Sequence, residues 1–361
     1  NISLSLRLSN TLMVLLIFFY FSSRKNLLKE NNKTIFFIFL SLLIGTSGGM
    51  FYGTNDSFHL TSLIIIYCEC YLYIKNKSHN NSILVASFII CILSRPLWVL
   101  TVPVILASCL IIEYLMAPPA HKLRDNKIII MFSFSILISF LFNYPRLLNE
   151  NLSSKNADGF HNYMSLSYTD KSNTYKTDDA NFNWTQWHYY SQMVANSKKF
   201  GLFAPLTSWN EVKNYKVLNG EGSLPKSPQK YVFGYPLQVL KRLPISLVEI
   251  FLMSIRYIGI FLFIIPISIF FKYIKNFRDD KRPLLIPVTV FLTILIFALI
   301  HPRMIENRWL SPAYIFSLIF ALDQDNYFKS ILNDNIILLN LLLMDLVTIW
   351  ALWKWRIFIN I

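Results

Sequence analysis

The chain alternates between long apolar runs and short polar connections. Apolar runs of roughly 17 to 25 residues recur along it, which is the length that an α-helix needs to cross a bilayer. The pattern predicts an all-α polytopic membrane protein with about ten transmembrane helices. These helices are expected at roughly residues 8–22, 35–51, 58–74, 82–94, 97–117, 128–143, 246–271, 284–300, 309–322 and 335–353.

One large polar segment interrupts this pattern. It divides the chain into an N-terminal transmembrane bundle of six segments (1–143), an external loop domain (144–245) and a C-terminal transmembrane bundle of four segments (246–361). Within the loop domain, the aromatic-rich stretch 181–205 fits a loose helical period. We therefore expect a partly helical external domain.

The composition agrees with a membrane protein. Charged residues make up 15% of the chain and hydrophobic residues 54%, whereas about a quarter of the residues in soluble domains are charged. All four cysteines lie inside apolar runs. Buried thiols behave as small hydrophobic groups, so neither a disulfide framework nor a zinc site is indicated.

The net charge of +14 is explained by membrane topology. Lys and Arg concentrate in the connections after the first, third, fifth and seventh apolar runs, which the positive-inside rule assigns to the cytoplasm. This distribution argues against nucleic acid as a partner. The connections around Asp56, around Arg95 and over 301–308 carry fewer cations. They are expected outside, on the same side as 144–245.

The short fourth run leaves one alternative for this topology. If residues 82–117 formed a single bent crossing, every later assignment would invert. The very basic loop at 272–282 would then face outward, which the positive-inside rule disfavours.

Asp56 lies between two strongly apolar runs, in the stretch MFYGTNDSFHL. One role is to cap the following helix by accepting backbone N–H hydrogen bonds. Another is chemical, because a carboxylate at a membrane boundary that faces a cavity can act as a general base or as a ligand of a divalent metal.

Cationic side chains mark two other external connections. Arg95 offers a guanidinium fork that suits phosphate, or it reaches a lipid headgroup. The loop at 301–308 carries His301, Arg303, Glu306 and Arg308. Two arginines on the less basic side favour a specific anionic partner, although an ion pair within the loop is an alternative.

The aromatic residues Trp184, Trp187 and Tyr189 are candidates for stacking on a sugar ring or a lipid chain. Trp and Tyr are equally expected at any membrane interface. The acidic residues Glu69, Glu113 and Asp345 lie within apolar runs. Each is expected to pair inside the helical bundle, because an isolated charge at bilayer depth is costly.

Four short stretches occur in an order that resembles the GT-C superfamily of polyprenyl-phosphate-sugar glycosyltransferases, of the protein O-mannosyltransferase and aminoarabinose transferase type. The family's S-x-R-L opening is similar to SLSLRLSN (3–10), and its acid before a helix is similar to GTNDSFHL. LSRPLW (93–98) stands in place of a T-K-G-P-like turn, and NRWLSPAY (307–314) resembles R-Y-x-x-P with Trp in place of Tyr.

The resemblance implies a principal catalytic acid upstream of SLRL, where this chain has no residue to receive it. Either the chain is an N-terminally truncated member or its activity is in doubt. The topology places Asn1 outside, where the missing loop would end, and so favours the truncated member.

The resemblance also implies a function: transfer of a sugar from a polyprenyl-phosphate donor to a lipid-linked or cell-surface glycan acceptor. The enzyme would lie in a bacterial inner membrane with its active site outside. Asp56 would be the surviving catalytic carboxylate, with a divalent metal as a possible cofactor, and Arg95, Arg303 and Arg308 would contact phosphate. The alternatives are an O-antigen-type polymerase and, from another class, a membrane transporter or flippase.

Overall fold

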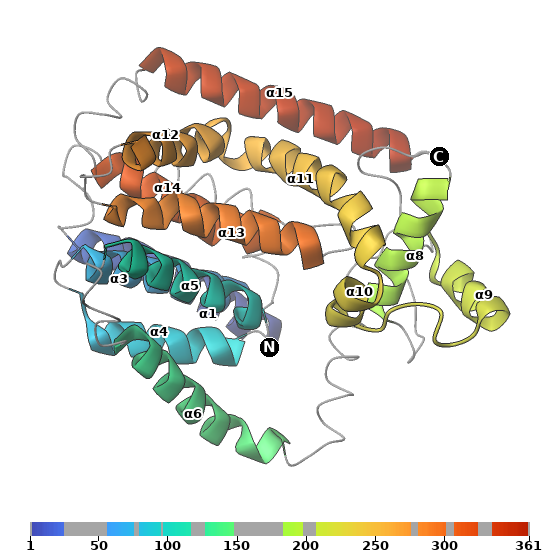
Figure 1. Ribbon diagram of the computed structural model, residues 1–361, viewed down its shortest axis with the longest axis horizontal. Coiled ribbons are helices and arrows are strands. Elements are labelled where there is room, and N and C mark those ends of the chain that lie inside the picture. The colour runs from blue at the N-terminus through green and yellow to red at the C-terminus, as the bar shows by residue number, and fades with distance from the viewer. Residues whose placement is uncertain are drawn as a thin grey trace. The chain divides into compact units, whose positions relative to one another are not determined.

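Every regular element in the described part of the chain is a helix (Figure 1). The computed structural model describes residues 2–24, 56–75, 79–94, 97–116, 127–147, 183–197, 207–275, 281–300, 307–323 and 334–359. The helices are α1 (Ile2–Ser23), α3 (Asp56–Ile74), α4 (Asn81–Ser94), α5 (Trp98–Met116), α6 (Lys127–Leu147), α8 (Trp184–Ser197), α9 (Trp209–Asn219), α10 (Pro228–Gly234), α11 (Pro236–Ile258), α12 (Phe261–Lys275), the short 3-10 helix η2 (Arg282–Leu284), α13 (Leu285–Ile300), α14 (Asn307–Asp323) and α15 (Asp334–Ile359).

Three helical stretches within the described ranges are long and apolar enough to cross a bilayer: Ser57–Ile74, Trp98–Met116 and Arg282–Ile300. The bent pair α11 and α12 adds a fourth if it counts as one span. The chain is thus all-helical with apolar spans, as expected of an α-helical membrane protein. The full set of ten spans stays a prediction, and the second expected span (35–51) lies outside the described residues.

The chain forms two compact units. The first comprises Asn1–Leu141, Leu252–Ile294 and Glu306–Ile357, and the second comprises Phe142–Phe251, Leu295–Ile305 and Phe358–Ile361. The second unit therefore contains the end of α6, the start of α11 and the end of α13 together with the long polar segment. The predicted boundaries at 143 and 245 stay a prediction.

Helix α3 is the centre of the first unit. It packs against α1, α4, α5 and α14, and its Tyr67 and Tyr71 rings both meet Phe316 of α14 edge-on, at centroid distances of 5.4 and 6.0 Å. A helix that is apolar on all sides is buried on all sides. This packing brings residues of α1, α4 and α5 close to the start of α3.

The directions of α4 and α5 follow from their contacts with α3. Helix α4 is antiparallel to α3, because the Asn80 amide before its start binds Glu69 and its Cys91 reaches His59 near the start of α3. Helix α5 is parallel to α3, with Thr101 beside His59 and Glu113 close to Tyr73. Residues 82–117 therefore form two separate helices in the structure, not one bent crossing.

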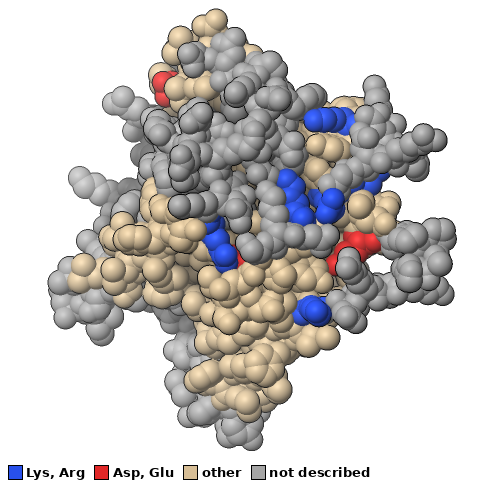
Figure 2. All heavy atoms as spheres, turned by 90° about the vertical axis from the view of Figure 1, so that its left-hand side faces the viewer, with Lys and Arg blue, Asp and Glu red and all other residues tan. Residues whose placement is uncertain are grey.

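The basic connections share one end of the first unit. Arg24, after α1, binds Glu69 near the end of α3. Lys281, before η2, donates its backbone N–H to Met116 Sδ at the end of α5 and its ammonium to the Tyr273 carbonyl near the end of α12. Figure 2 shows the face on the left of Figure 1, where α12 ends, and Lys and Arg side chains gather on it.

The predicted seventh segment (246–271) is broken at Gly259 in the structure. The α11 and α12 axes meet at 104°, and Gly259 has a left-handed φ of 66°. Asn340 of α15 accepts a hydrogen bond from the Ile260 N–H (2.7 Å) and donates one to the Ile258 carbonyl (3.3 Å). One buried amide therefore satisfies backbone groups on both sides of the break, which a membrane environment requires.

The second unit has its own apolar core. The core joins α8, α9, α10 and the start of α11 through Trp187, Tyr189, Trp209, Val212, Leu224, Tyr231 and Val239. Ser208 and Glu211 form a reciprocal capping box at the start of α9, which satisfies two backbone donors that the helix leaves free. The described part of the long polar segment thus contains several helices with non-helical connections, which agrees with the predicted partly helical character.

Candidate functional site

Asp56 is the first residue of α3, at the end of this helix opposite the basic connections. Only its backbone is described. A carboxylate in the first turn of a helix is stabilised by the partial positive charge of the free N–H groups. The position therefore suits a helix-stabilising role and a chemical role equally well.

His59 lies one turn after Asp56 and is buried, with 5% of its surface exposed. Its Nδ1 is 3.5 Å from Cys91 Sγ of α4, and its Nε2 is 3.5 Å from Thr101 Oγ1 of α5. The contact with Thr101 is at the long limit of a hydrogen bond to oxygen, whereas 3.5 Å is an ordinary distance for a contact with sulfur. His59 is not among the residues predicted for the site, although its spacing of three residues from Asp56 puts both on one side of a helix.

Other polar side chains are buried around this end of α3. Ser62 donates to the Phe58 carbonyl at 2.7 Å, and Thr61 donates to the Met13 carbonyl of α1 at 3.2 Å. Thr101 donates to the Leu97 carbonyl at 3.2 Å. Each of these hydroxyls donates to a backbone carbonyl. They line the site as neutral groups.

Arg95 lies outside the described residues, but its flanks are placed. Ser94 ends α4 and Leu97 precedes α5, and the contacts of Cys91 and Thr101 with His59 put both flanks at the Asp56 end of α3. The described residues on either side of Arg95 thus lie at the same end of α3 as Asp56.

Most of the predicted phosphate-binding residues are not described. His301, Arg303 and Glu306 lie outside the described residues, and Arg308 is the second residue of α14 with an undescribed side chain. Leu299, two residues before His301, packs against the core of the second unit. The predicted external loop at 301–308 follows α13. The end of α13 belongs to the second unit, which also contains the long polar segment.

Two of the predicted stacking residues lie in that core. Trp187 is 8% and Tyr189 is 7% exposed. The Trp187 indole N–H donates to the Thr207 carbonyl at 2.7 Å, and Tyr189 packs on the Tyr231 and Tyr235 rings. Both rings are engaged in packing, which leaves little surface for a sugar. Their stacking role stays a prediction, as does that of Trp184, whose side chain is not described.

Burial also sets the acidity of the aromatic core. It raises the pKa of the Tyr189 and Tyr231 hydroxyls to about 12, because a phenolate is poorly solvated among apolar rings. These hydroxyls remain neutral at physiological pH. They act as packing groups in this core.

The acidic residues of the apolar runs differ in their surroundings. The buried Glu69 carboxylate accepts hydrogen bonds from the Tyr20 hydroxyl (2.6 Å), from Arg24 (2.7 Å) and from the Asn80 N–H (2.7 Å). Its predicted pairing inside the bundle is confirmed. Asp345, in contrast, is exposed on α15, so its predicted pairing inside the bundle is wrong. Glu249 pairs with Arg242 at 2.5 Å in the second unit.

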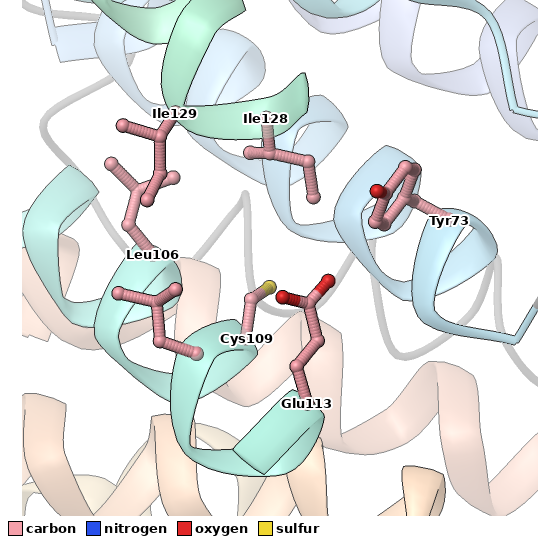
Figure 3. A pocket seen from close by; sticks show the side chains of 7 residues that line it. Tyr73, Leu106, Cys109, Glu113, Ile128 and Ile129 are labelled. Carbon is pink, nitrogen blue, oxygen red and sulfur yellow. The ribbon is translucent and has the colours of Figure 1, made fainter. Parts of the chain in front are cut away.

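A small pocket lies at the basic end of the first unit, away from Asp56 (Figure 3). The Glu113 carboxylate and the Cys109 thiol point into it from α5, opposite Tyr73 of α3. Leu106, Leu110, Ile128 and Ile129 complete its lining. Its apolar walls and small size indicate a packing defect beside Glu113 and not a substrate site.

Among the described side chains, no group of three or more His, Cys, Asp or Glu could hold a metal ion. The Asp56 side chain is not among them, so its role as a metal ligand stays a prediction. Comparisons of the chain with models of protein families, with curated proteins and with solved structures find no match.

Proposed function

We propose that the chain is an integral membrane glycosyltransferase that uses a polyprenyl-phosphate-linked sugar donor. The acceptor is a lipid-linked or cell-surface glycan on the outer side of the membrane. The observation that carries the proposal is the position of Asp56 at the start of α3, at the end opposite the basic connections and at the same end as Ser94 and Leu97, the described residues that flank Arg95.

The chemistry needs a base on one side of the sugar and cations on the other. The Asp56 carboxylate takes the proton of the acceptor hydroxyl, and the oxygen attacks the anomeric carbon of the donor. The new glycosidic bond forms as the bond from this carbon to the phosphate oxygen breaks, with inversion at the carbon. Polyprenyl phosphate leaves, and Arg95, Arg303 and Arg308 stabilise its negative charge. No nucleotide takes part.

The resemblance of SLSLRLSN, GTNDSFHL, LSRPLW and NRWLSPAY to the GT-C superfamily supports this proposal. It also implies that the principal catalytic acid lies upstream of SLRL. The decisive assay therefore uses membranes that contain the product of the gene together with its upstream coding sequence. An upstream external loop without an acid would contradict the family assignment.

Replacing the Asp56 carboxylate by an amide tests its role. We expect Asp56→Asn to lower the release of polyprenyl phosphate from a labelled donor by at least about 100-fold, because the base is lost. The protein level in the membrane should not change. Glu221→Gln makes the same chemical change at an exposed residue of the second unit and should leave the rate unchanged. Equal rates in both variants would reduce Asp56 to a helix-stabilising residue.

One observation favours a second candidate function. Discontinuous helices are typical of transporter binding sites. The helical segment formed by α11 and α12 is interrupted at Gly259. A transporter or flippase would move a labelled polyprenyl-linked sugar across a vesicle membrane with its glycosidic bond intact. Cleavage of this bond, dependent on Asp56, distinguishes the transferase.

A further inference from the structure

The exposed face of α15 has an unusual composition for a membrane helix. Its large apolar side chains are strongly exposed, among them Leu338 (59%), Leu342 (52%), Leu346 (64%) and Ile349 (63%). The opposite side is buried in the first unit through Asn340 and Met344. Asp345 belongs to the exposed face, between Leu342 one turn before it and Ile349 one turn after it.

The exposed face of α6 gives a direct contrast. It presents Ile130 (65%), Phe134 (53%), Leu137 (56%) and Leu141 (63%), and residues 128–142 contain no ionisable group. Such a face needs only lipid around it. The α15 face differs by one carboxyl group in an otherwise similar surface.

Hydrocarbon is an unfavourable environment for this carboxyl group. Asp345 is eleven residues from the start of α15 at Asp334, which is about 16 Å along the helix axis. An aspartate side chain is too short to reach an interface over this distance. In the described part of the chain, Asp345 takes part in no hydrogen bond or ion pair. Acidic groups inside a membrane normally pair with a cation or line a polar cavity.

We propose that the exposed face of α15 binds a transmembrane helix of a partner protein that carries Lys or Arg at the depth of Asp345. Charge complementarity selects this occupant. Lipid alone leaves the carboxylate unpaired, and a second copy of this chain, docked face to face, brings two carboxylates together in an apolar interface, where like charges repel. A cation on the partner helix forms the pair, and the leucines of α15 supply the packing.

A synthetic probe tests this chemistry. The purified full chain is reconstituted in phosphatidylcholine vesicles with a leucine-rich transmembrane peptide that has one lysine at its centre. A matched peptide has leucine at that position. We expect energy transfer between labels to report at least tenfold tighter binding of the lysine peptide. Asp345→Leu should abolish the difference, and Asp345→Glu should retain it.

Folding of the variants does not obscure the result, because Asp345 is exposed and Asp345→Leu only extends an apolar surface. Asp345→Asn provides a second variant that keeps the shape of the side chain and removes the charge. Equal binding of the two peptides to the wild-type chain would overturn the proposal. So would undiminished binding of the lysine peptide to Asp345→Leu, or self-association of the chain that requires Asp345.

The placement of α15 in the membrane has its own test. An Asp345→Cys variant should react slowly with a membrane-impermeant maleimide, whereas Glu221→Cys, at an exposed position of the second unit, should react fast. The native cysteines are buried and give little background. Fast reaction at position 345 would put this face in water and overturn the proposal, whatever the outcome for the proposed transferase activity.

Discussion

The two ends of α3 hold their polar side chains in different ways. At the basic end, Glu69 accepts hydrogen bonds from Tyr20, Arg24 and the Asn80 N–H at 2.6 to 2.7 Å. At the opposite end, His59 has contacts with Cys91 and Thr101 at 3.5 Å. The first arrangement satisfies a buried charge with three short hydrogen bonds, whereas the second holds a buried ring through one contact with sulfur and one long contact with a hydroxyl.

This difference suggests different roles for the polar groups at the two ends of α3: Glu69 is structural, and the residues at the Asp56 end are the candidates for chemistry. Short charge-assisted hydrogen bonds hold a carboxylate in one geometry and leave it little capacity for other partners. Long contacts leave the hydrogen-bonding capacity of a side chain largely unused. The end with Asp56 and His59 is therefore the end of α3 to which we assign the proposed substrate site.

The largest effect is expected from a substitution at the basic end of α3. Glu69→Leu should lower the free energy of unfolding by about 3 kcal/mol, because it leaves the buried Tyr20 hydroxyl and the partly buried Arg24 without their acceptor. His59→Leu, the matched change at the other end, should cost less than about 1 kcal/mol. Denaturant titration in detergent micelles, followed by Trp fluorescence, measures both.

The double variant Glu69→Leu/Arg24→Met is the control for this prediction. It removes the uncompensated charge together with its partner, so it should recover part of the stability that Glu69→Leu loses. If Glu69→Leu and His59→Leu had the same effect, the two ends of α3 would not differ as proposed.

Asn340 of α15 is a third buried polar group, and like Glu69 it is held by a short hydrogen bond. A Cβ atom at Gly259 would lie 2.0 Å from Asn340 Oδ1, and φ at Gly259 is left-handed. Gly259→Ala should therefore destabilise the first unit by about 2 kcal/mol or more. Gly222→Ala, where nothing lies within 4 Å of the added atom, should change stability by less than about 0.5 kcal/mol. The same denaturant titration tests both variants. Equal effects would contradict the close contact between Asn340 and the backbone at Gly259.

The sequence predicted the helical class and much of the order of the helices, because apolar length and loop charge act through local physical rules. It also predicted that α4 and α5 are separate. It did not predict the break at Gly259, which depends on a buried Asn340 far along the chain. A hydropathy pattern contains no information on such a tertiary contact.

The candidate site was predicted only in part, for a related reason. Asp56 is visible in the sequence as an acid between apolar runs, whereas His59 is defined by contacts with Cys91 and Thr101 on two other helices. The sequence also gave no means to tell Glu69, which finds three donors, from Asp345, which is exposed on α15. Both are acids in apolar runs, and only packing distinguishes them.

The smallest expected effect extends the comparison to the aromatic core of the second unit, where Tyr189 and Tyr231 bury neutral hydroxyls. Burial raises the pKa of Tyr189 and Tyr231 from 10.0 to about 12 in the folded protein. Between these pH values the unfolded chain loses protons that the folded chain retains, so the stability of this unit should be constant below pH 10 and should fall from there toward pH 12. Ultraviolet absorbance of tyrosinate, recorded with Trp fluorescence during an alkaline titration, follows ionisation and unfolding together. Tyr231→Phe removes one of the two groups and should make the decline with pH shallower, because fewer protons distinguish the two states. An unchanged decline in Tyr231→Phe would show that another group controls the alkaline transition. It would contradict the raised pKa of the Tyr231 hydroxyl.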